Sequence, residues 1–205
     1  MLRLYMFGGE DIEKRDARSL NEQAFRDAGG SPTVAIFPWA SKVKEEKQRR
    51  LMVTYFKELG ARSVRFVERS LPFTEMVAIA ESSEIIYLPE GDPKLLIETL
   101  RDTGSLHLLR LHDNVIIGNS AGALALCGEY IIPTKNSDEL AIEKGLGLSD
   151  FVICVQYDKA QDLQLERLSA DRSIFAIPAG AAIGSDNCSL SLLGEVELFI
   201  DGKKL

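Results

Sequence analysis

The chain has 205 residues, a length that suits one α/β domain spanning 1–205 and leaves little room for a second core. Its 24 basic and 31 acidic residues give a formal net charge of −7, which argues against a nucleic acid or an anionic membrane as partner. The apolar runs are too short to span a bilayer, and the three cysteines are widely spaced, as in reduced proteins. We therefore expect a cytoplasmic α/β protein with neither nucleic-acid nor membrane partners.

Short apolar segments alternate with amphipathic segments through most of the chain. Strands are expected at 2–7, 33–37, 63–67, 84–88 and 114–117, and helices at 11–28, 42–59, 74–81, 93–101, 106–111 and 121–127. Beyond Tyr130 the pattern loosens, with strands expected at 151–155, 174–177, 189–193 and 197–200, a helix at 163–170 and a terminal hairpin or edge strand at 195–202. This alternation predicts a doubly wound, mostly parallel sheet with helices on both faces.

Three loops that contain glycine or proline follow predicted strands. They lie at 8–10, 89–92 and 118–122. Because ligands bind at the carboxyl ends of parallel strands, we expect these loops to converge on the functional site.

The third loop, Gly-Asn-Ser-Ala-Gly at 118–122, fits the Gly-x-Ser-x-Gly nucleophile elbow. A strand precedes it and a helix follows it, so the turn would hold the Ser120 hydroxyl clear of the sheet. The N–H of Ala121, at the start of that helix, suits an oxyanion. The competing interpretation is a tight turn in which Ser120 only caps the helix.

This elbow resembles that of the dipeptidase E and cyanophycinase family of serine peptidases, and the likeness continues in patches along the chain. Further similar segments lie at 4–11, 88–92, 145–148, 194–196 and 201–202. The resemblance implies a class I glutamine amidotransferase-like fold and a serine-peptidase-like hydrolase that acts on a small peptide or isopeptide. It makes Ser120 the nucleophile and places Gly91, Asp92, Ala121 and Gly122 at the oxyanion hole and pocket.

The family's catalytic histidine is missing. Its position falls on Gln156 or Tyr157, depending on register, and no histidine follows Ser120. His112 precedes the strand whose far end carries Ser120, and His107 lies earlier still, so neither is expected to act as the base.

The acidic partner is also unresolved by the sequence. Asp138 lies in the region where dipeptidase E members place an aspartate, whereas the family's later acidic segment aligns with 177–182, which has no carboxylate. Asp158 and Asp186 are other candidates, and for all three acids a solvated loop acid is the preferred interpretation.

Two substitutes for the histidine are conceivable. Glu90 replaces a glycine in the oxyanion loop, where its carboxylate opposes a developing negative charge unless it points outward or serves as the base. A Ser–Lys pair with Lys135 or Lys159 is the other arrangement.

Two functions therefore stand at this point. One is a serine hydrolase with an unorthodox base, and the other is a ligand-binding or regulatory protein that kept the pocket after losing the base. We expect no cofactor and no metal, a small peptide-like substrate or ligand, and a homodimer as one option for assembly. Cys127 is expected in the core, and Trp39 at a pocket rim or in the core.

Overall fold

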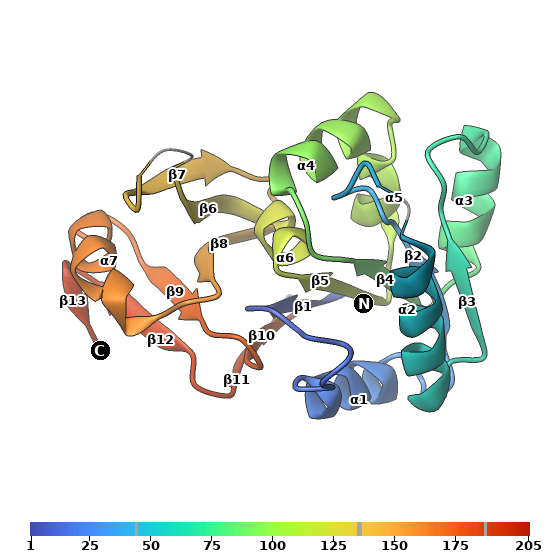
Figure 1. Cartoon of the computed structure of the whole chain (residues 1–205), viewed down its shortest axis with the longest axis horizontal. Helices are drawn as coiled ribbons and strands as arrows, with labels where there is room; N and C mark the ends of the chain where they lie inside the picture. The colour runs from blue at the N-terminus through green and yellow to red at the C-terminus, as the bar shows by residue number, and fades with distance from the viewer. Residues whose placement is uncertain (44, 135–136, 187) are drawn as a thin grey trace.

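The computed structural model describes residues 1–43, 45–134, 137–186 and 188–205, and it contains two mixed β-sheets that lie next to each other (Figure 1). The strands of the larger sheet are β1 (Arg3–Phe7), β2 (Thr33–Ile36), β3 (Ser63–Phe66), β4 (Ile85–Leu88), β5 (Val115–Asn119), β10 (Ala182–Ser185) and β11 (Leu190–Leu193). Those of the smaller sheet are β6 (Cys127–Pro133), β7 (Leu140–Lys144), β8 (Ser149–Val155), β9 (Ile174–Ile177), β12 (Glu197–Ile200) and β13 (Lys203–Lys204). Their spatial orders are β11-β10-β1-β5-β4-β2-β3 and β13-β12-β9-β8-β6-β7.

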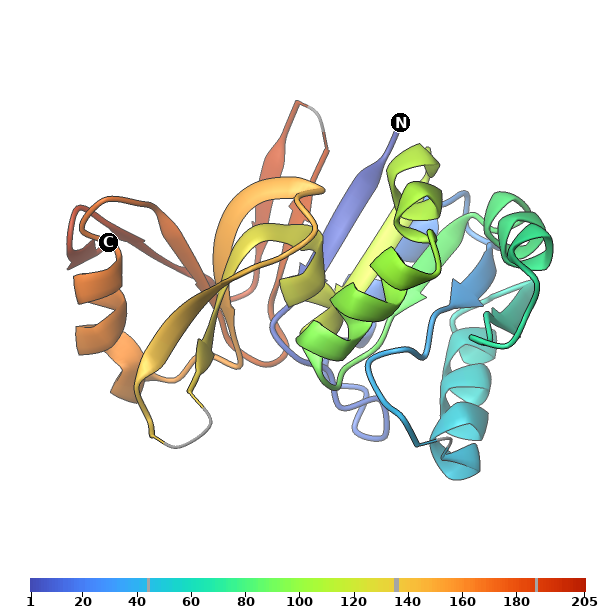
Figure 2. The same ribbon diagram turned by 90° about the horizontal axis from the view of Figure 1, so that it is seen from above.

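Helices cover both faces of the larger sheet, whose strands β1, β5, β4, β2 and β3 run parallel (Figures 1 and 2). The helices are α1 (Arg18–Asp27) and α2 (Glu46–Glu58) on one face, and α3 (Phe73–Glu81), α4 (Pro93–Asp102), α5 (Leu106–Leu111) and α6 (Ala121–Leu126) on the other. Side chains alternate accordingly along β1, since Tyr5 and Phe7 share the core of α1 and α2 whereas Leu4 and Met6 share that of α4 and α6. The predicted fold class is confirmed.

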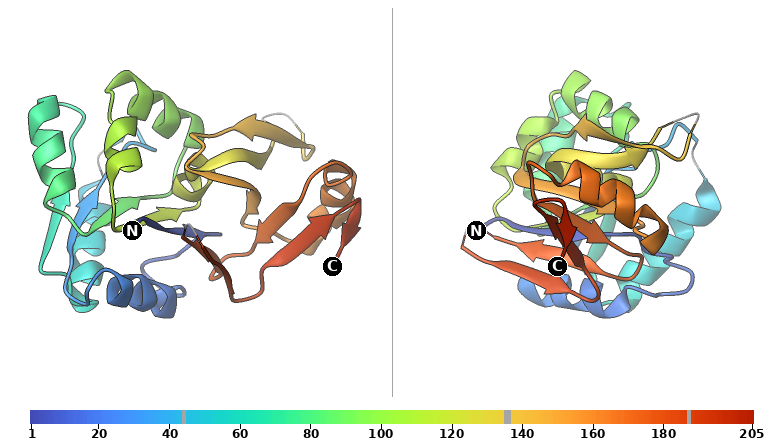
Figure 3. Two further views of the ribbon diagram at one scale, coloured as in Figure 1. Left: turned by 180° about the vertical axis from the view of Figure 1, so that it is seen from behind. Right: turned by 90° about the vertical axis from the view of Figure 1, so that its left-hand side faces the viewer.

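The smaller sheet is also covered on both faces. Helix α7 (Asp162–Leu168) packs on the face that carries Cys154, Ile174 and Phe199. The opposite face, with Ile153 and Phe175, belongs to the same buried cluster as Met6 and α6. Figure 3 shows this sheet from behind and from its outer side.

Three strands and the starts of two helices differ from the prediction, since the helix expected at 42–59 begins at Glu46. The strands β6, β7 and β10 were not expected, and the helix expected at 11–28 begins only at Arg18. The Asp11 carboxylate accepts hydrogen bonds from the backbone N–H groups of Glu13 and Lys14, which fixes a turn instead of a helix. In the described part of the chain, none of the helices has the length and apolar character needed to cross a membrane.

The carboxyl ends of strands from both sheets meet at one place. At the end of β1, the Phe7 carbonyl oxygen accepts from the Ser120 N–H at 3.1 Å, and the Gly8 carbonyl oxygen accepts from the Gln156 N–H at 2.8 Å. The loop after β5 and the loop after β8 are thereby tied to the loop after β1. The candidate functional site lies where these loops meet.

Candidate functional site

Ser120 lies on a sharp turn between β5 and α6. Its backbone adopts φ 49° and ψ −105°, a conformation that costs a non-glycine residue of the order of 1–3 kcal/mol. The residue is 8% exposed, and its carbonyl oxygen accepts from the Leu124 N–H in the first turn of α6. The backbone therefore has the strained geometry that an elbow requires.

Gly122 lets α6 approach the neighbouring strand β4. A Cβ atom at this position would lie 2.1 Å from the Leu88 carbonyl oxygen, so no larger residue fits without a backbone shift. The N–H groups of Ala121 and Gly122 belong to the first turn of α6, where backbone donors have no partner within a helix. These two predicted site residues therefore follow Ser120 directly, at the start of α6.

Gln156 is the residue that contacts the serine. Its side-chain Nε2 atom donates a hydrogen bond to Ser120 Oγ at 3.1 Å. Gln156 is exposed and has φ 52°, so a second residue with a strained backbone, directly after β8, contacts the buried Ser120.

Tyr157 points elsewhere. Its hydroxyl donates to the Asp162 carboxylate at the start of α7 and accepts from Lys204 Nζ at 2.6 Å. Of the two residues at which the family's histidine could fall, the structure brings Gln156 to Ser120 and places Tyr157 against the far edge of the smaller sheet.

A glutamine cannot replace a histidine as a base. In either orientation of its amide, Gln156 exchanges one hydrogen bond with the hydroxyl, but neither amide atom takes up a proton at neutral pH. Ser120 therefore has a hydrogen-bond partner that positions its oxygen without activating it.

The loop after β4 contributes Glu90, Gly91 and Asp92. Gly91 has φ 140° and packs against Ala40, where an added Cβ would lie 2.4 Å from the carbonyl oxygen. The Asp92 carboxylate accepts from the N–H groups of Lys94 and of Leu95, so it caps α4. Burial and the charge of Asp11 raise the pKa of Glu90.

Asp138, the candidate acid, is exposed between β6 and β7. Its carbonyl oxygen accepts from Gln164 Nε2 of α7 at 3.0 Å. Among the described residues, no hydrogen bond or ion pair joins Asp138 to Ser120 or Gln156.

Two of the other candidate acids accept hydrogen bonds from backbone N–H groups close to them in the sequence. Asp158 caps the short 3₁₀ helix η1 (Lys159–Gln161), and the Asp186 carboxylate accepts from the N–H groups of Cys188 and Ser189. Lys159 is exposed at the first position of η1. Lys135 lies outside the described residues.

The two histidines, Cys127 and Trp39 lie in the positions that the sequence predicts for them. His112 follows α5 at the amino end of β5, where burial lowers its pKa, and His107 is exposed on α5. Cys127 is fully buried, as predicted. Trp39 is 1% exposed, donates from its indole N–H to the Val67 carbonyl oxygen at 2.7 Å, and also lines a hollow.

Glu10 is a buried carboxylate in the loop expected at 8–10, and the sequence assigned no separate role to it. Its Oε1 atom accepts from the Tyr55 hydroxyl at 2.6 Å and from Asn21 Nδ2 at 2.7 Å. Burial is the main cause of the raised pKa of Glu10, and the charges of Asp16 and Glu90 raise it further. The signal in the sequence was an acid directly after the glycine turn of β1, at the carboxyl edge of the sheet.

Two adjoining hollows open near the elbow, one lined by Gln156, the hydrogen-bond partner of Ser120, and the other by Asn119; Ser120 itself lines neither of them. The acidic hollow, of about 430 Å³, is lined by Glu10, Asp11, Asp16, Glu90 and Gln156 among others. The aromatic hollow, of about 480 Å³, is lined by a larger set that includes Trp39, Met52, Tyr87 and Asn119, the neighbour of Ser120. Both hollows share Ile12, Gln48 and Glu90, so a ligand could extend from one into the other.

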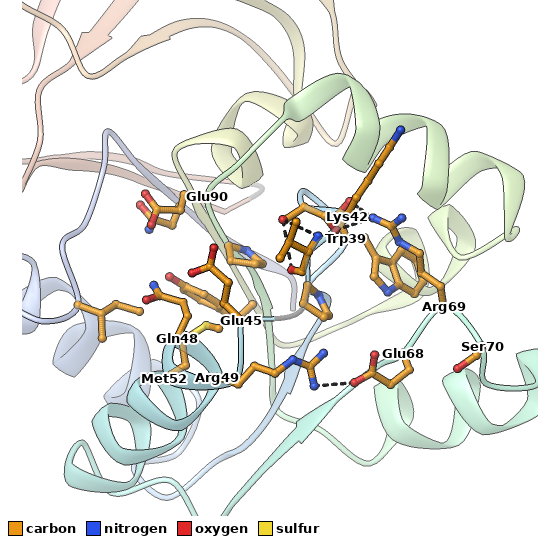
Figure 4. A pocket seen from close by; sticks show the side chains of 17 residues that line it. Trp39, Lys42, Glu45, Gln48, Arg49, Met52, Glu68, Arg69, Ser70 and Glu90 are labelled. Carbon is orange, nitrogen blue, oxygen red and sulfur yellow. Dashed lines mark hydrogen bonds and ion pairs between the residues drawn. The ribbon is translucent and has the colours of Figure 1, made fainter.

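The aromatic hollow carries both signs of charge. Figure 4 shows Glu45, Gln48 and Glu90 on one side of it and Lys42 and Arg69 on the other. The acidic side is the one that continues into the acidic hollow. In the described ranges, no three His, Cys, Asp or Glu side chains are grouped so as to hold a metal ion.

Comparison with solved structures places the fold among peptidases. A peptidase from an acI-B1 Actinobacterium is similar with a TM-score of 0.73 and 18% identity over 99% of this chain and 93% of its own. A putative peptidase E protein from Listeria monocytogenes EGD-e is similar with a TM-score of 0.71 and 20% identity over 94% of this chain and 98% of its own. No curated protein matches the sequence closely enough to count as a relative.

The comparison with family models is decisive for the family. The model of peptidase family S51 matches residues 4–192, from the first residues of β1 to β11, and this match includes the elbow and Gln156. The chain belongs to peptidase family S51.

Proposed function

We propose that this protein uses the peptidase scaffold to bind a small peptide-like ligand beside Ser120 and does not turn it over as a serine–histidine peptidase does. This proposal rests on the 3.1 Å hydrogen bond that Gln156 Nε2 donates to Ser120 Oγ. An amide donor on the hydroxyl oxygen draws electron density from it and accepts no proton, so the nucleophile stays in its unreactive form.

The composition of the two hollows supports this proposal. An aromatic and aliphatic floor supplies contact area, and charged groups of both signs suit a small zwitterion such as a peptide. The loop between β9 and β10, where the family's later acidic segment aligns, brings Ala179 to the acidic hollow instead of a carboxylate.

A serine hydrolase with another base is the second candidate. It is favoured by the strained backbone of Ser120, because such strain persists only where the surrounding structure enforces it. Glu90 would be its base, since it lines the same hollow as Gln156 and its raised pKa moves it toward the working range of a general base.

Labelling with a small fluorophosphonate, followed by intact mass, separates the two candidates. We expect slow labelling of the wild type, none of Ser120→Ala, and labelling about 100-fold faster in Gln156→His, the low end of general-base effects. Tyr157→His is the matched control and should not accelerate, because that side chain faces Asp162.

Binding is measured separately by calorimetric titration with dialanine, for which we expect saturable heat. Rapid, stoichiometric labelling of Ser120 in the wild type would favour the hydrolase instead. If the folded wild-type protein does not bind dialanine, the proposal of a peptide-like ligand is contradicted.

A further inference from the structure

Arg69 is held in a fixed position at the wall of the aromatic hollow. Its Nη2 atom donates to the carbonyl oxygens of Trp39 at 2.6 Å and of Ser41 at 3.0 Å, and all three residues line the hollow. These bonds tie the loop after β3 to the loop after β2. Because two acceptors already restrict the guanidinium, a ligand that contacts it does not have to order a free arginine side chain.

The remaining donors of the Arg69 guanidinium have no protein partner in the described part of the chain. The Nη1 and Nε atoms donate to none of the described residues, and none of their carboxylates forms an ion pair with Arg69. Because Arg69 is exposed, a ligand can reach the guanidinium from the hollow that it lines. A guanidinium offers planar N–H donors in the geometry that a carboxylate accepts.

The side of the aromatic hollow that carries Arg69 is positively charged. Lys42 lies on the same side, is exposed and forms no ion pair with a described residue, whereas Glu45 lies on the opposite side (Figure 4). Arg49, the other arginine of the hollow, forms an ion pair with Glu68 at 2.6 Å, so its charge is compensated. An anionic group of a ligand is therefore directed toward Arg69 and Lys42.

Apolar surface is exposed in the same hollow. Val43 is 68% exposed, Pro38 and Pro89 are half-buried, and Met52 of α2 lines the hollow with them. The volume of about 480 Å³ suits a small molecule, and small-molecule sites combine apolar walls with a few fixed polar groups. The hollow therefore suits a carboxylate that is joined to an apolar group.

We propose that the aromatic hollow binds the C-terminal residue of a small peptide, with the peptide's carboxylate on Arg69 and its apolar side chain against Val43 and Pro89. This assignment rests on the proposed ligand-binding function and deepens it. It names the ligand class, peptides that end in a free carboxylate on an apolar residue. It also orients the ligand, whose remainder extends past Asn119 toward the elbow.

Calorimetric titration with alanyl-phenylalanine tests the assignment, and alanyl-phenylalanine amide is the matched ligand without the carboxylate. We expect saturable one-site binding of the dipeptide that weakens as KCl is raised. The amide should bind about tenfold more weakly, as expected for the loss of a charge-assisted hydrogen bond. Dialanine should also bind more weakly than alanyl-phenylalanine, because its methyl group buries less apolar surface.

Arg69→Gln should weaken binding of the dipeptide about tenfold and leave binding of the amide unchanged, because the amide has no carboxylate for Arg69 to contact. A purely structural role of Arg69 in tying the two loops would weaken both ligands alike. Arg65→Gln, at an exposed position of β3 that does not line the hollow, is the matched control and should change neither affinity.

Lys42→Gln keeps the test decisive if Arg69→Gln folds poorly, because Lys42 is exposed and its ammonium group has no partner among the described residues. It should weaken dipeptide binding about threefold, the size of an exposed ion pair. Equal binding of dipeptide and amide, or an equal effect of Arg69→Gln on both, would overturn the assignment. So would dipeptide binding that neither Lys42→Gln nor added KCl weakens.

A further probe, 3-phenylpropionate, separates this inference from the proposed function, because it carries the ring and the carboxylate but no peptide bond that could be cleaved. If the wild type labels rapidly at Ser120 and 3-phenylpropionate binding still depends on Arg69, the proposed function is wrong while the carboxylate assignment stands. If dialanine and alanyl-phenylalanine amide bind as tightly as alanyl-phenylalanine, the carboxylate assignment is wrong while peptide binding stands.

Discussion

Burial of the Glu10 carboxyl makes the stability of the folded protein depend on pH. In the folded protein, burial raises the pKa of Glu10 above its ordinary value of 4.5, so between the unfolded and the folded pKa the folded state holds a proton that the unfolded state has already released. The contribution of this group to stability is therefore fully present below the unfolded pKa and is lost as the pH rises through the folded pKa.

Glu10→Gln should remove this dependence while keeping an acceptor for Tyr55 and Asn21. We expect the variant to gain stability relative to the wild type at pH 8 and much less so at pH 5, measured by urea unfolding. Glu75→Gln serves as the exposed control and should show no such difference. An equal change at both pH values would mean that Glu10 has the same pKa in the folded and unfolded states.

The sequence alone predicts only those parts of the candidate site that one short segment defines. Ser120 could be predicted because the spacing of Gly118 and Gly122 around it is a property of one short segment. The contact with Gln156 could not, because it depends on how β8 of the smaller sheet meets β5 of the larger one. From the sequence, either Gln156 or Tyr157 could occupy the position of the family's histidine. The structure distinguishes them because the Gln156 side chain contacts Ser120 and the Tyr157 side chain contacts Asp162.

At the scale of elements, the start of α4 shows how a site prediction and a structural task can fall on one residue. Asp92 stands in the loop expected to form the oxyanion hole, and its carboxylate accepts from Lys94 N at 2.9 Å and from Leu95 N at 3.2 Å. It therefore caps the helix and complements the positive end of its dipole.

Asp92→Ala should lower the free energy of unfolding by about 1 kcal/mol, the usual effect of losing an N-cap, and Asp92→Asn by less. Asp102→Ala, at the exposed C-terminal end of the same helix, is the matched control and should not destabilise the protein. Urea unfolding followed by circular dichroism gives the comparison. Equal stability of Asp92→Ala and the wild type would show that the cap contributes nothing.

Strands and helices with a clear pattern of apolar residues were predicted well, and strands that depend on pairing with a distant part of the chain were not. The strands β1, β2 and β4 are buried apolar runs bounded by turn residues, so their sequences indicate them directly. The strand β7 is half-buried and mixes charged with apolar residues, and it is a strand because it pairs with β6 along five residues. The turn at Asp11 depends on hydrogen bonds to one carboxylate. The spacing of apolar residues, on which the helix prediction rested, gives no information about such bonds.

At the scale of the whole molecule, one buried cluster joins the two sheets. It includes Met6 and Ile116 from the larger sheet and Tyr130, Ile153 and Phe175 from the smaller. Since neither sheet can separate without exposing this cluster, we expect residues 1–205 to unfold as a single unit.

The three cysteines can report on this cooperativity. Cys188 is exposed, whereas burial raises the pKa of both Cys127 and Cys154 to about 12. The Cys127 thiol lies 3.5 Å from the Met6 sulfur, in the cluster between the sheets, and Cys154 lies under α7 within the smaller sheet. Each buried thiol therefore samples a different part of the core and reacts only when that part opens.

In a Cys188→Ser variant, N-ethylmaleimide applied across a urea series and read by peptide mass should modify Cys127 and Cys154 with one common midpoint, coincident with the loss of circular dichroism. The reason is that the shared cluster couples the opening of both sheets, so neither thiol becomes accessible before global unfolding. A lower midpoint for Cys154 alone would show that the smaller sheet opens first and that residues 1–205 form two units. In that case the Gln156 side chain, carried by the smaller sheet, would leave Ser120 before the elbow itself unfolds.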